Sequence, residues 1–347
     1  MRIRHVTESL PRVSVVIINY NGVDRLEQTL HAVELLAYPE VAEVVVVDDG
    51  SSDGSQFLVR ERFPHIRLVE LGQNQGAAAA RNRALAEAGS ELIFLLDNDI
   101  VVEPDCLSHL VRAKQKVPHA GAVHPTIIDQ HDPRLSAHYN GGFIHYLCAY
   151  IPKDQVEEDH AVYDVVSGGA LLLEKSLAER IGGFDEAYVF NWEDGDFLFR
   201  LTLTGRPCLN VTAAKVTHTA APRGTSKAFF QVRNRWFFII KMYGWRTIAL
   251  SAPALIVFEC SQFLFLLLKG AGKEYVTGTW AAARQLPELL RKRRAVHLLK
   301  VAHDRDVLRS GDLYVPPQLL NNPVLRVFKR AYVGFFNVYW LLIRKFV

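Results

Sequence analysis

The chain has 347 residues, of which 49% are hydrophobic and 22% charged, and its mean hydropathy is +0.05. This length allows one large α/β domain with an appendage, or two ordinary domains. The composition is apolar for a soluble enzyme and too polar for a protein with many membrane-spanning helices, so we expect a peripheral membrane protein.

The net charge of +3 hides an uneven distribution. Residues 269–347 carry 15 Lys and Arg against 5 Asp and Glu, whereas residues 1–268 carry 25 against 32. A basic C-terminal part favours an anionic partner, either lipid headgroups or nucleic acid. Because that part contains no recognisable nucleic-acid-reading module, we expect a membrane surface and no nucleic acid as its partner.

The cysteines and the N-terminus both favour the cytoplasm. The four cysteines are scattered and form no CxxC pair, so we expect neither a zinc site nor a disulfide framework. Residues 1–12 have no apolar core of signal-peptide length. We therefore expect the catalytic part to remain in the cytoplasm.

The N-terminal part alternates short strands with helices. Strands are predicted at runs rich in β-branched residues, and helices where apolar residues recur with helical spacing. The predicted strands are 13–19, 44–48, 66–71 and 92–97, and the predicted helices are 23–36, 55–62 and 77–88. This alternation predicts a parallel sheet covered on both faces, with ligands bound beyond the carboxyl ends of the strands.

The part that follows is predicted to be mixed and to shape the pocket of an acceptor substrate. The predicted helices are 104–116, 175–181 and 193–204, and strands or hairpins are expected at 121–129, 143–151 and 162–173. No internal repeat or low-complexity linker interrupts the sequence. We therefore expect one catalytic domain at residues 1–245 and a basic, aromatic helical region at residues 246–347.

Residues 247–268 form an apolar stretch long enough to cross a membrane. Glu259 costs about 2.5 to 3.5 kcal/mol on insertion scales and Pro253 loosens the helix, so a re-entrant or in-plane segment is an alternative to a spanning helix. The basic segment that follows favours the cytoplasm, as does the catalytic part, and this disfavours a single crossing. Aromatic and aliphatic residues at 331–347 favour an interfacial anchor, the alternative being a helix docked on the protein's own core.

Polar clusters follow three of the predicted strands and are expected to meet at one sheet edge. The clusters are Asn19-Tyr20-Asn21, Asp48-Asp49-Gly50-Ser51 and Asp97-Asn98-Asp99. In an extended chain, Asp97 and Asp99 would point to the same side. Mg²⁺ or Mn²⁺ prefers oxygen ligands and keeps positions for substrate phosphates. The pair therefore predicts a metal that would neutralise the charge growing on a nucleotide diphosphate as a sugar bond breaks.

Further residues are predicted to contact a nucleotide. Asp49 is favoured for a contact to the base or ribose, whereas Ser52 and Asp53 are better explained as a strand-to-helix turn with an N-cap. Gly76 precedes an Ala-rich helix that packs on the sheet. Arg81, one turn into that helix, could reach a phosphate or pair with an aspartate.

The acidic segment that begins at Glu193 offers a general base. Glu193, Asp194 and Asp196 could simply be charges that the helix dipole favours. One carboxylate near a bound sugar could instead take the proton from an attacking hydroxyl. His218 could be a further metal ligand or a structural residue, and the sequence leaves both open.

These motifs together resemble those of the family 2 glycosyltransferases, inverting enzymes of the GT-A fold, and especially the rhamnosyltransferase-like members of bacterial polysaccharide biosynthesis. The resemblance covers residues 13–241 and rests on seven motifs in family order. They are SVVIINYN, VVVVDDGSSDGS, NQGAAAARN, LLDND, SGGALLLEKSLAERIGGFDEAYVFNWEDGDFLFR, VTHT and RNRWFFIIKMYG. The Ala-rich run is plainer than is usual for the family, and no motif fixes the choice of donor.

The resemblance implies a Rossmann-like GT-A α/β fold, with a mixed sheet, helices on both faces and C-terminal membrane-associated helices. It implies that Asp97 contacts the ribose or the metal, that Asp99 binds the metal with His218 close by, and that Asp194 is the catalytic base beside Glu193. The donor side would comprise Asn19, Tyr20, Asn21, Asp49, Gly76, Arg81, Asp97 and Asn98, and the acceptor side Gly168, Gly169 and Trp192.

The expected activity is the inverting transfer of a sugar from a UDP- or dTDP-sugar to a glycan or lipid-linked glycan, with Mg²⁺ or Mn²⁺ as the cofactor. The enzyme is expected to be peripheral or monotopic, on the cytoplasmic side of the cell membrane. A sugar nucleotidyltransferase would need a Gly-rich basic loop after the first strand, and a dehydrogenase would need GxGxxG there. The chain has Asn19-Tyr20-Asn21 at this place, which argues against both classes of enzyme. A catalytically silent scaffold is the other alternative, and Asp97, Asp99 and Asp194 argue against it.

Overall fold

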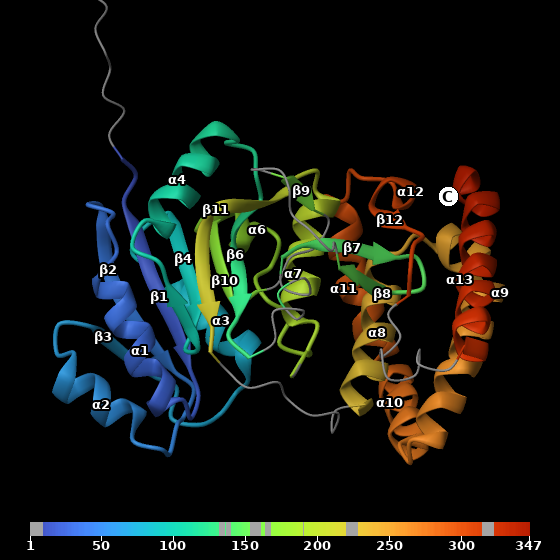
Figure 1. The fold of residues 1–347 in the computed structure, drawn as a ribbon, viewed down its shortest axis with the longest axis horizontal. Helices are drawn as coiled ribbons and strands as arrows, with labels where there is room; N and C mark the ends of the chain where they lie inside the picture. Colours follow the sequence, from blue (N-terminus) through green and yellow to red (C-terminus); the bar gives the residue numbers. More distant parts are fainter. Residues whose placement is uncertain are drawn as a thin grey trace, which may run out of the picture.

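The computed structural model describes residues 10–131, 136, 140–152, 161–163, 168–189, 191–219, 228–313 and 323–347. In this part of the chain, a sheet with helices on both faces stands beside a group of C-terminal helices (Figure 1). The strand predicted at 162–173 lies partly outside the described residues, at 164–167.

The strands form one large sheet and one small sheet. Their bounds are β1 (Val13–Asn19), β2 (Val41–Asp48), β3 (Arg67–Glu70), β4 (Leu92–Asp97), β5 (Ile100–Val102), β6 (Ala122–Asp129), β7 (Gly142–His145), β8 (Ala149–Pro152), β9 (Ala161–Tyr163), β10 (Ala170–Glu174), β11 (Cys208–His218) and β12 (Leu308–Arg309). The large sheet has the order β3-β2-β1-β4-β10-β6-β11-β5, and β9 also pairs with β11. The small sheet has the order β12-β7-β8.

The helices alternate with strands in the first half of the chain and follow one another in the last third. Their bounds are α1 (Val23–Glu34), α2 (Ser55–Arg62), α3 (Ala77–Glu87), α4 (Cys106–Lys116), α6 (Lys175–Arg180), α7 (Glu193–Leu203), α8 (Ala228–Met242), α9 (Trp245–Leu268), α10 (Gly272–Arg284), α11 (Leu286–Leu299), α12 (Asp304–Val307) and α13 (Pro323–Ile343), with a 3₁₀ turn at Arg344–Phe346. The C-terminal helices lie at the end of the molecule opposite to β3 and α2 (Figure 1).

The large sheet is mixed, in agreement with the expected GT-A fold. Strands β3, β2, β1 and β4 are mutually parallel, as the alternation of strands and helices predicts. Strand β10 lies antiparallel between β4 and β6, and β5 is antiparallel to β11. The sequence pattern predicts neither β5 nor β11, because β5 has only three residues and β11 has polar residues interspersed among its apolar ones.

Two apolar cores cover the two faces of the large sheet. On β1, Val15 and Ile17 pack on the side of α1, α2 and α4, whereas Val16 and Ile18 pack on the side of α3, α6 and α7. Successive side chains of a strand point to opposite faces, so a strand buried on both sides is a continuous apolar run. This double burial explains why β1 is apolar from Val15 to Ile18, while the polar Asn19 ends the strand at the sheet edge.

A third core joins the C-terminal helices to the rest of the chain. It contains Phe199 of α7, Phe238 of α8, Phe258 of α9 and Trp340 of α13. Helix α13 therefore docks on the protein through one face, as the alternative to an interfacial anchor predicted. Another part of its surface is apolar and exposed, with Phe335, Val338, Leu341 and Leu342. The division of the chain at residues 245 and 246 stays a prediction.

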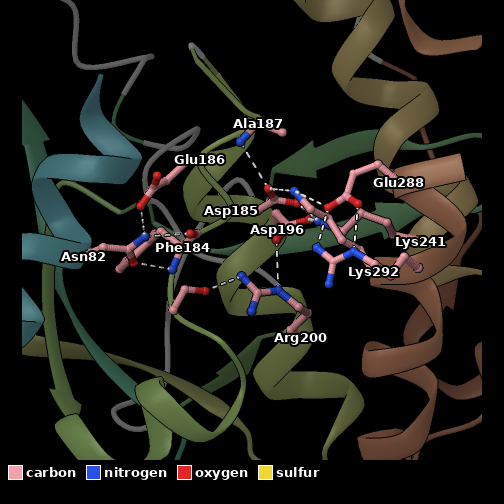
Figure 2. Close-up of polar contacts among 12 residues, drawn as sticks. Asn82, Phe184, Asp185, Glu186, Ala187, Asp196, Arg200, Lys241, Glu288 and Lys292 are labelled. Atoms are coloured by element: carbon pink, nitrogen blue, oxygen red, sulfur yellow. Dashed lines mark hydrogen bonds and ion pairs between the residues drawn. The ribbon is translucent and has the colours of Figure 1, made fainter. Parts of the chain in front are cut away.

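A buried network of charges also links these helices to α7 (Figure 2). Lys241 of α8 bonds to Asp185 and, at 2.6 Å, to Asp196 of α7. Lys292 of α11 bonds to the other oxygen of Asp185, and Arg200 Nε donates to Asp196 at 2.9 Å. Burial by itself would raise the pKa of Asp185, but the two lysines hold it well below its usual range. The network thus fixes α8 and α11 against the helix that begins with Glu193.

We expect Lys241→Met to lower the free energy of unfolding by about 3–5 kcal/mol, because it leaves two buried carboxylates without their shared cation. Urea unfolding followed by circular dichroism measures this change. Arg291→Met is the control, since Arg291 pairs with Glu288 on the surface and its side chain is 72% exposed. Equal stability of the two variants would contradict the importance of the network.

Candidate active site

Asn19, at the end of β1, connects the three polar clusters. Its Nδ2 donates to Asp48 at 2.7 Å and to Ser51 at 3.1 Å, and its Oδ1 accepts from Asn98 Nδ2 at 2.6 Å. Asn19 is only 2% exposed. The clusters that end β1, β2 and β4 therefore meet at one edge of the sheet, where Asn19 and Asn98 fix them to each other.

The loop between β1 and α1 is held by its neighbours on the β2 side. Asn21 has a φ of 46° and accepts from the backbone N–H of Ser52 at 2.8 Å. Asp53 accepts from the N–H groups of Val23 and Ser55, the first residues of α1 and α2, which agrees with the turn role expected for it. The expected N-cap role is wrong, because Gly54 is the N-cap residue of α2. Tyr20 is 48% exposed at this edge. The donor contacts expected for Tyr20 and Asn21 stay predictions.

Asp49 holds the loop that leads into α3. Its carboxylate accepts from the backbone N–H groups of Gln75 at 2.7 Å and Gly76 at 2.9 Å. Gly50 has a φ of 73°, and a Cβ there would lie 2.5 Å from the carbonyl carbon of Gln73, so only glycine permits this close approach. The nucleotide contact expected for Asp49 stays a prediction, because the structure shows its carboxylate bound to backbone.

Arg81 pairs with two carboxylates in the interior of the site. Its Nη2 lies 2.9 Å and 3.2 Å from the two oxygens of Asp97, and its Nη1 lies 3.1 Å from Glu193 Oε1. Arg81 is 3% exposed, and its guanidinium also lies 5.6 Å from the ring of Phe184. The predicted pairing of Arg81 with an aspartate is confirmed, and it joins β4 to the first residue of α7.

The carboxylates of the site raise one another's pKa. Burial raises the pKa of Asp97 to about 6; Arg81 acts against this shift, while Asp99 and Asp194 add to it. Burial and Asp194 likewise raise the pKa of Glu193, against the effect of Arg81. These four carboxyl groups thus lie close enough to interact, although only Asp97 and Glu193 share a cation among the described residues.

Asp99 and His218 face each other across the pairing of β5 with β11. The chain turns at Asn98 and Asp99, so the extended conformation expected from Asp97 to Asp99 is wrong. His218 Nε2 lies 3.7 Å from Asp99 Oδ2, and its Nδ1 donates to Asp129 at 3.2 Å. Asp99 is 4% exposed, and its Oδ1 has no hydrogen-bond partner in the described part of the chain.

Asp129 is a residue of the site that was not predicted from the sequence. This residue ends β6 as Asp48 ends β2, so the same strand-end rule could have singled it out. A carboxylate that accepts from one nitrogen of a histidine fixes the ring and directs its other nitrogen to a metal or substrate. Asp129 therefore has the position of an orienting group for His218.

Asp194 is fixed by two backbone N–H groups at the start of α7. Its Oδ2 accepts from Gly168 at 2.8 Å and its Oδ1 from Gly195 at 2.7 Å. A Cβ at position 168 would lie 2.4 Å from the Cβ of Asp194, so Gly168 allows the contact by having no side chain. The carbonyl of Gly169 accepts from the N–H of Asp97 at 2.9 Å. The segment before β10 thus touches both Asp97 and Asp194.

Trp192 adopts an uncommon backbone conformation just before α7. Asn191 and Trp192 have φ values of 65° and 75°, in the left-handed region that few residues other than glycine adopt. Asn234 Nδ2 donates to the carbonyl of Asn191 at 2.7 Å, and the indole packs on Phe238 with ring centroids 5.1 Å apart. Such strain persists where the surroundings hold it, often at functional sites.

A mixed sheet with carboxylates at one edge and an acidic helix start paired to them through Arg81 is the arrangement expected for the GT-A fold. Residues 14–181 match the family model described as Glycosyl transferase family 2, so this part of the chain is a family 2 glycosyltransferase domain. The family and the fold implied by the sequence motifs are therefore confirmed.

Two curated relatives illustrate the similarity. The N-acetylglucosaminyl-diphospho-decaprenol L-rhamnosyltransferase of Mycobacterium tuberculosis is 28% identical over 242 residues, which cover 62% of this chain and 78% of the relative. The poly-beta-1,6-N-acetyl-D-glucosamine synthase of Staphylococcus epidermidis is 32% identical over 113 residues, which cover 32% of this chain and 27% of the relative.

Solved structures share the fold at low sequence identity. A crystal structure of GalNAc-T7 with UDP, GalNAc and Mn²⁺ matches with a TM-score of 0.59 and 17% identity, over 71% of this chain and 51% of that chain, which is about half of its length. A crystal structure of S. aureus TarS matches with a TM-score of 0.51 and 15% identity, over 79% of this chain and 91% of that chain. At such identities the likeness concerns the fold alone.

Proposed function

We propose that this protein is an inverting glycosyltransferase that moves a sugar from a UDP- or dTDP-sugar to a hydroxyl of a lipid-linked glycan in cell-surface polysaccharide biosynthesis. The observation that carries the proposal is the placement of Asp194 at the start of α7, where the N–H of Gly168 bonds to Asp194 and the carbonyl of Gly169 bonds to the strand-end residue Asp97. The name of the mycobacterial relative, which contains a decaprenol-linked acceptor and an L-rhamnosyl group, supports this class of substrate.

Asp194 acts in the proposed reaction as the general base. It takes the proton of the acceptor hydroxyl while that oxygen forms a bond to the anomeric carbon, and the nucleoside diphosphate leaves with the electron pair of the old bond. A single displacement of this kind inverts the anomeric centre. The N–H groups of Gly168 and Gly195 hold the carboxylate of Asp194 in place. Less conformational entropy of this side chain is therefore lost when the transition state forms.

Arg81 and Glu193 position the donor side. Arg81 balances the charge of Asp97 and Glu193, so the diphosphate of the donor meets less repulsion at the sheet edge. The carboxylate of Asp97 stays directed to the site by this pairing, where it accepts hydrogen bonds from the ribose in the proposed complex. Asn19 and Asn98 keep the edge rigid.

The residues present fit a divalent cation that binds together with the nucleotide. Asp99 offers a buried oxygen with no partner among the described residues, and His218 is oriented by Asp129. Mg²⁺ and Mn²⁺ suit such a pair of ligands, since these ions take few protein ligands and complete their shell with phosphate and water. Bound there, the cation would balance charge on the departing diphosphate.

We expect Asp194→Asn to lower kcat for sugar transfer by about 10²–10⁴-fold, because the amide cannot accept the proton. Binding of UDP or dTDP, measured by calorimetry, should be unchanged, since Asp194 has no role in nucleotide binding. The donor is found first by screening nucleotide sugars for hydrolysis with Mg²⁺ or Mn²⁺. Transfer at the wild-type rate by Asp194→Asn would refute the assignment.

Two glycine variants serve as a matched pair for this experiment. Gly168→Ala should also lose transfer activity, because the new methyl group would displace Asp194. Gly169→Ala should lose much less, because its Cβ would lie 3.5 Å from Ile100, an ordinary contact. Equal losses in the two variants would show that the position of Asp194 is not what matters.

We expect Asp99→Asn to abolish the effect of Mn²⁺ on nucleotide binding. In the wild-type protein, UDP or dTDP should bind about tenfold more tightly with Mn²⁺ than with EDTA, and this ratio should approach one in the variant. Asp105→Asn, at an exposed carboxylate before α4, is the control. A variant at Asp99 that keeps the wild-type ratio would exclude this residue as a metal ligand.

The proposed location is the cytoplasmic membrane surface, where α9 and α13 make contact. Helix α9 is long and apolar enough to cross a membrane by length and composition, and it is the one such helix in the described part of the chain. Its Glu259 pairs with Arg235 of α8, and its Phe258 packs in the third core, so α9 is fixed to the catalytic part. We therefore favour a helix that lies in the interface over one that spans it.

We expect the triple variant Leu264→Gln, Leu341→Gln, Leu342→Gln to bind less to vesicles of phosphatidylglycerol in a sedimentation assay. These side chains are 56%, 66% and 63% exposed and would enter the headgroup region. The control is Leu35→Gln with Phe57→Gln, two apolar residues of α1's end and α2 that are 69% and 67% exposed. Equal sedimentation of both variants would contradict the proposed surface.

A further inference from the structure

A cavity of about 380 Å³ lies between the start of α7 and the C-terminal helices. Small-molecule sites commonly have volumes of about 300–1,000 Å³. Its walls come from segments far apart in the sequence. They are Asn191 and Trp192 before α7, Gln231 and Arg235 of α8, Phe258, Gln262, Phe265 and Leu266 of α9, Ala149 and Tyr150 of β8, and Tyr332 of α13.

Trp192 links the wall of this cavity to the proposed active site. It lies two residues before Asp194, and the left-handed conformation of Asn191 and Trp192 is held by Asn234 and by the contact of the indole with Phe238. The residue for which an acceptor contact is predicted therefore also lines the cavity.

Helix α9 links the wall of the cavity to the proposed membrane surface. Phe265 and Leu266 line the cavity, and their neighbours Leu264, Leu267 and Leu268 are 56%, 53% and 78% exposed. An apolar chain that enters from the lipid can thus keep contact with apolar side chains along the way to Trp192.

The charge in the cavity wall is already balanced. Arg235 is 8% exposed and pairs with Glu259, whose other oxygen accepts from Tyr275 at 2.5 Å. The guanidinium also lies 5.0 Å from the ring of Phe258. A wall with no uncompensated charge favours an uncharged ligand over an anion, because desolvating an anion there gains no new partner.

We propose that this cavity binds the apolar isoprenoid-type chain of the acceptor lipid and so presents the head of the acceptor to Asp194. The proposal rests on the proposed function and adds the place where the lipid is held. It assigns Trp192 to the boundary between the polar head and the chain, a position that amphipathic aromatic side chains favour.

Farnesyl diphosphate is the probe for this proposal, with inorganic diphosphate as the probe that lacks the chain. We expect the full-length protein to bind farnesyl diphosphate more tightly than inorganic diphosphate in calorimetry. Ala149→Trp and Gln262→Trp, which fill the cavity from opposite walls, should each weaken farnesyl diphosphate binding by about tenfold. Gln115→Trp on α4 is the control and should bind like the wild type, since its side chain is exposed away from the cavity.

A photoreactive benzophenone analogue of farnesyl diphosphate then locates the chain by mass spectrometry. Labels on Tyr150, Trp192 or Phe258 are expected. Labels confined to the exposed face of α9, or unchanged affinity in both cavity-filling variants, would overturn the proposal. Failure of the proposed function is distinguishable, because it would appear as retained transfer by Asp194→Asn, whatever the outcome with the lipid.

Discussion

The buried network around Lys241 is the interaction on which the rest of the architecture depends. One ammonium group compensates Asp185 and Asp196, and Lys292 and Arg200 complete the shell of those carboxylates (Figure 2). Isolated charges cannot remain buried without such partners, so α8 and α11 have little freedom to move relative to α7. Because α7 begins with Glu193 and Asp194, the same contacts that hold the C-terminal helices also fix the proposed base.

Arg81 repeats this arrangement inside the site. It compensates Asp97 at the end of β4 and Glu193 at the start of α7, and so connects the sheet edge to the helix across 112 residues of sequence. Two buried cations, Arg81 and Lys241, are thus each shared by two carboxylates, and each of them bonds to a carboxylate of α7. The remaining carboxylates, Asp99 and Asp194, are held by backbone or lie near His218, and they are the groups that the proposed reaction uses.

The C-terminal helices connect this site to the proposed membrane surface. They share a core with α7 and α8, leave apolar faces of α9 and α13 exposed, and enclose a cavity that reaches Trp192. An enzyme that acts on a lipid-linked acceptor must bring a polar head to its base while the chain stays in an apolar environment. The cavity lined by Trp192 and by residues of α9 meets both conditions in the proposed complex.

The sequence by itself determined the helices and parallel strands of the first half, the family, and the gathering of Asn19, Asp49 and Asp97 at one sheet edge. These follow from local signals, namely apolar periodicity, turn residues and the rule that parallel strands end together. Only the tertiary structure decided which carboxylate each cation serves, that the chain turns at Asn98, and that Asp129 orients His218. The physical reason is that β10 lies between β4 and β6, so partners far apart in the sequence meet through a strand order that no local pattern encodes.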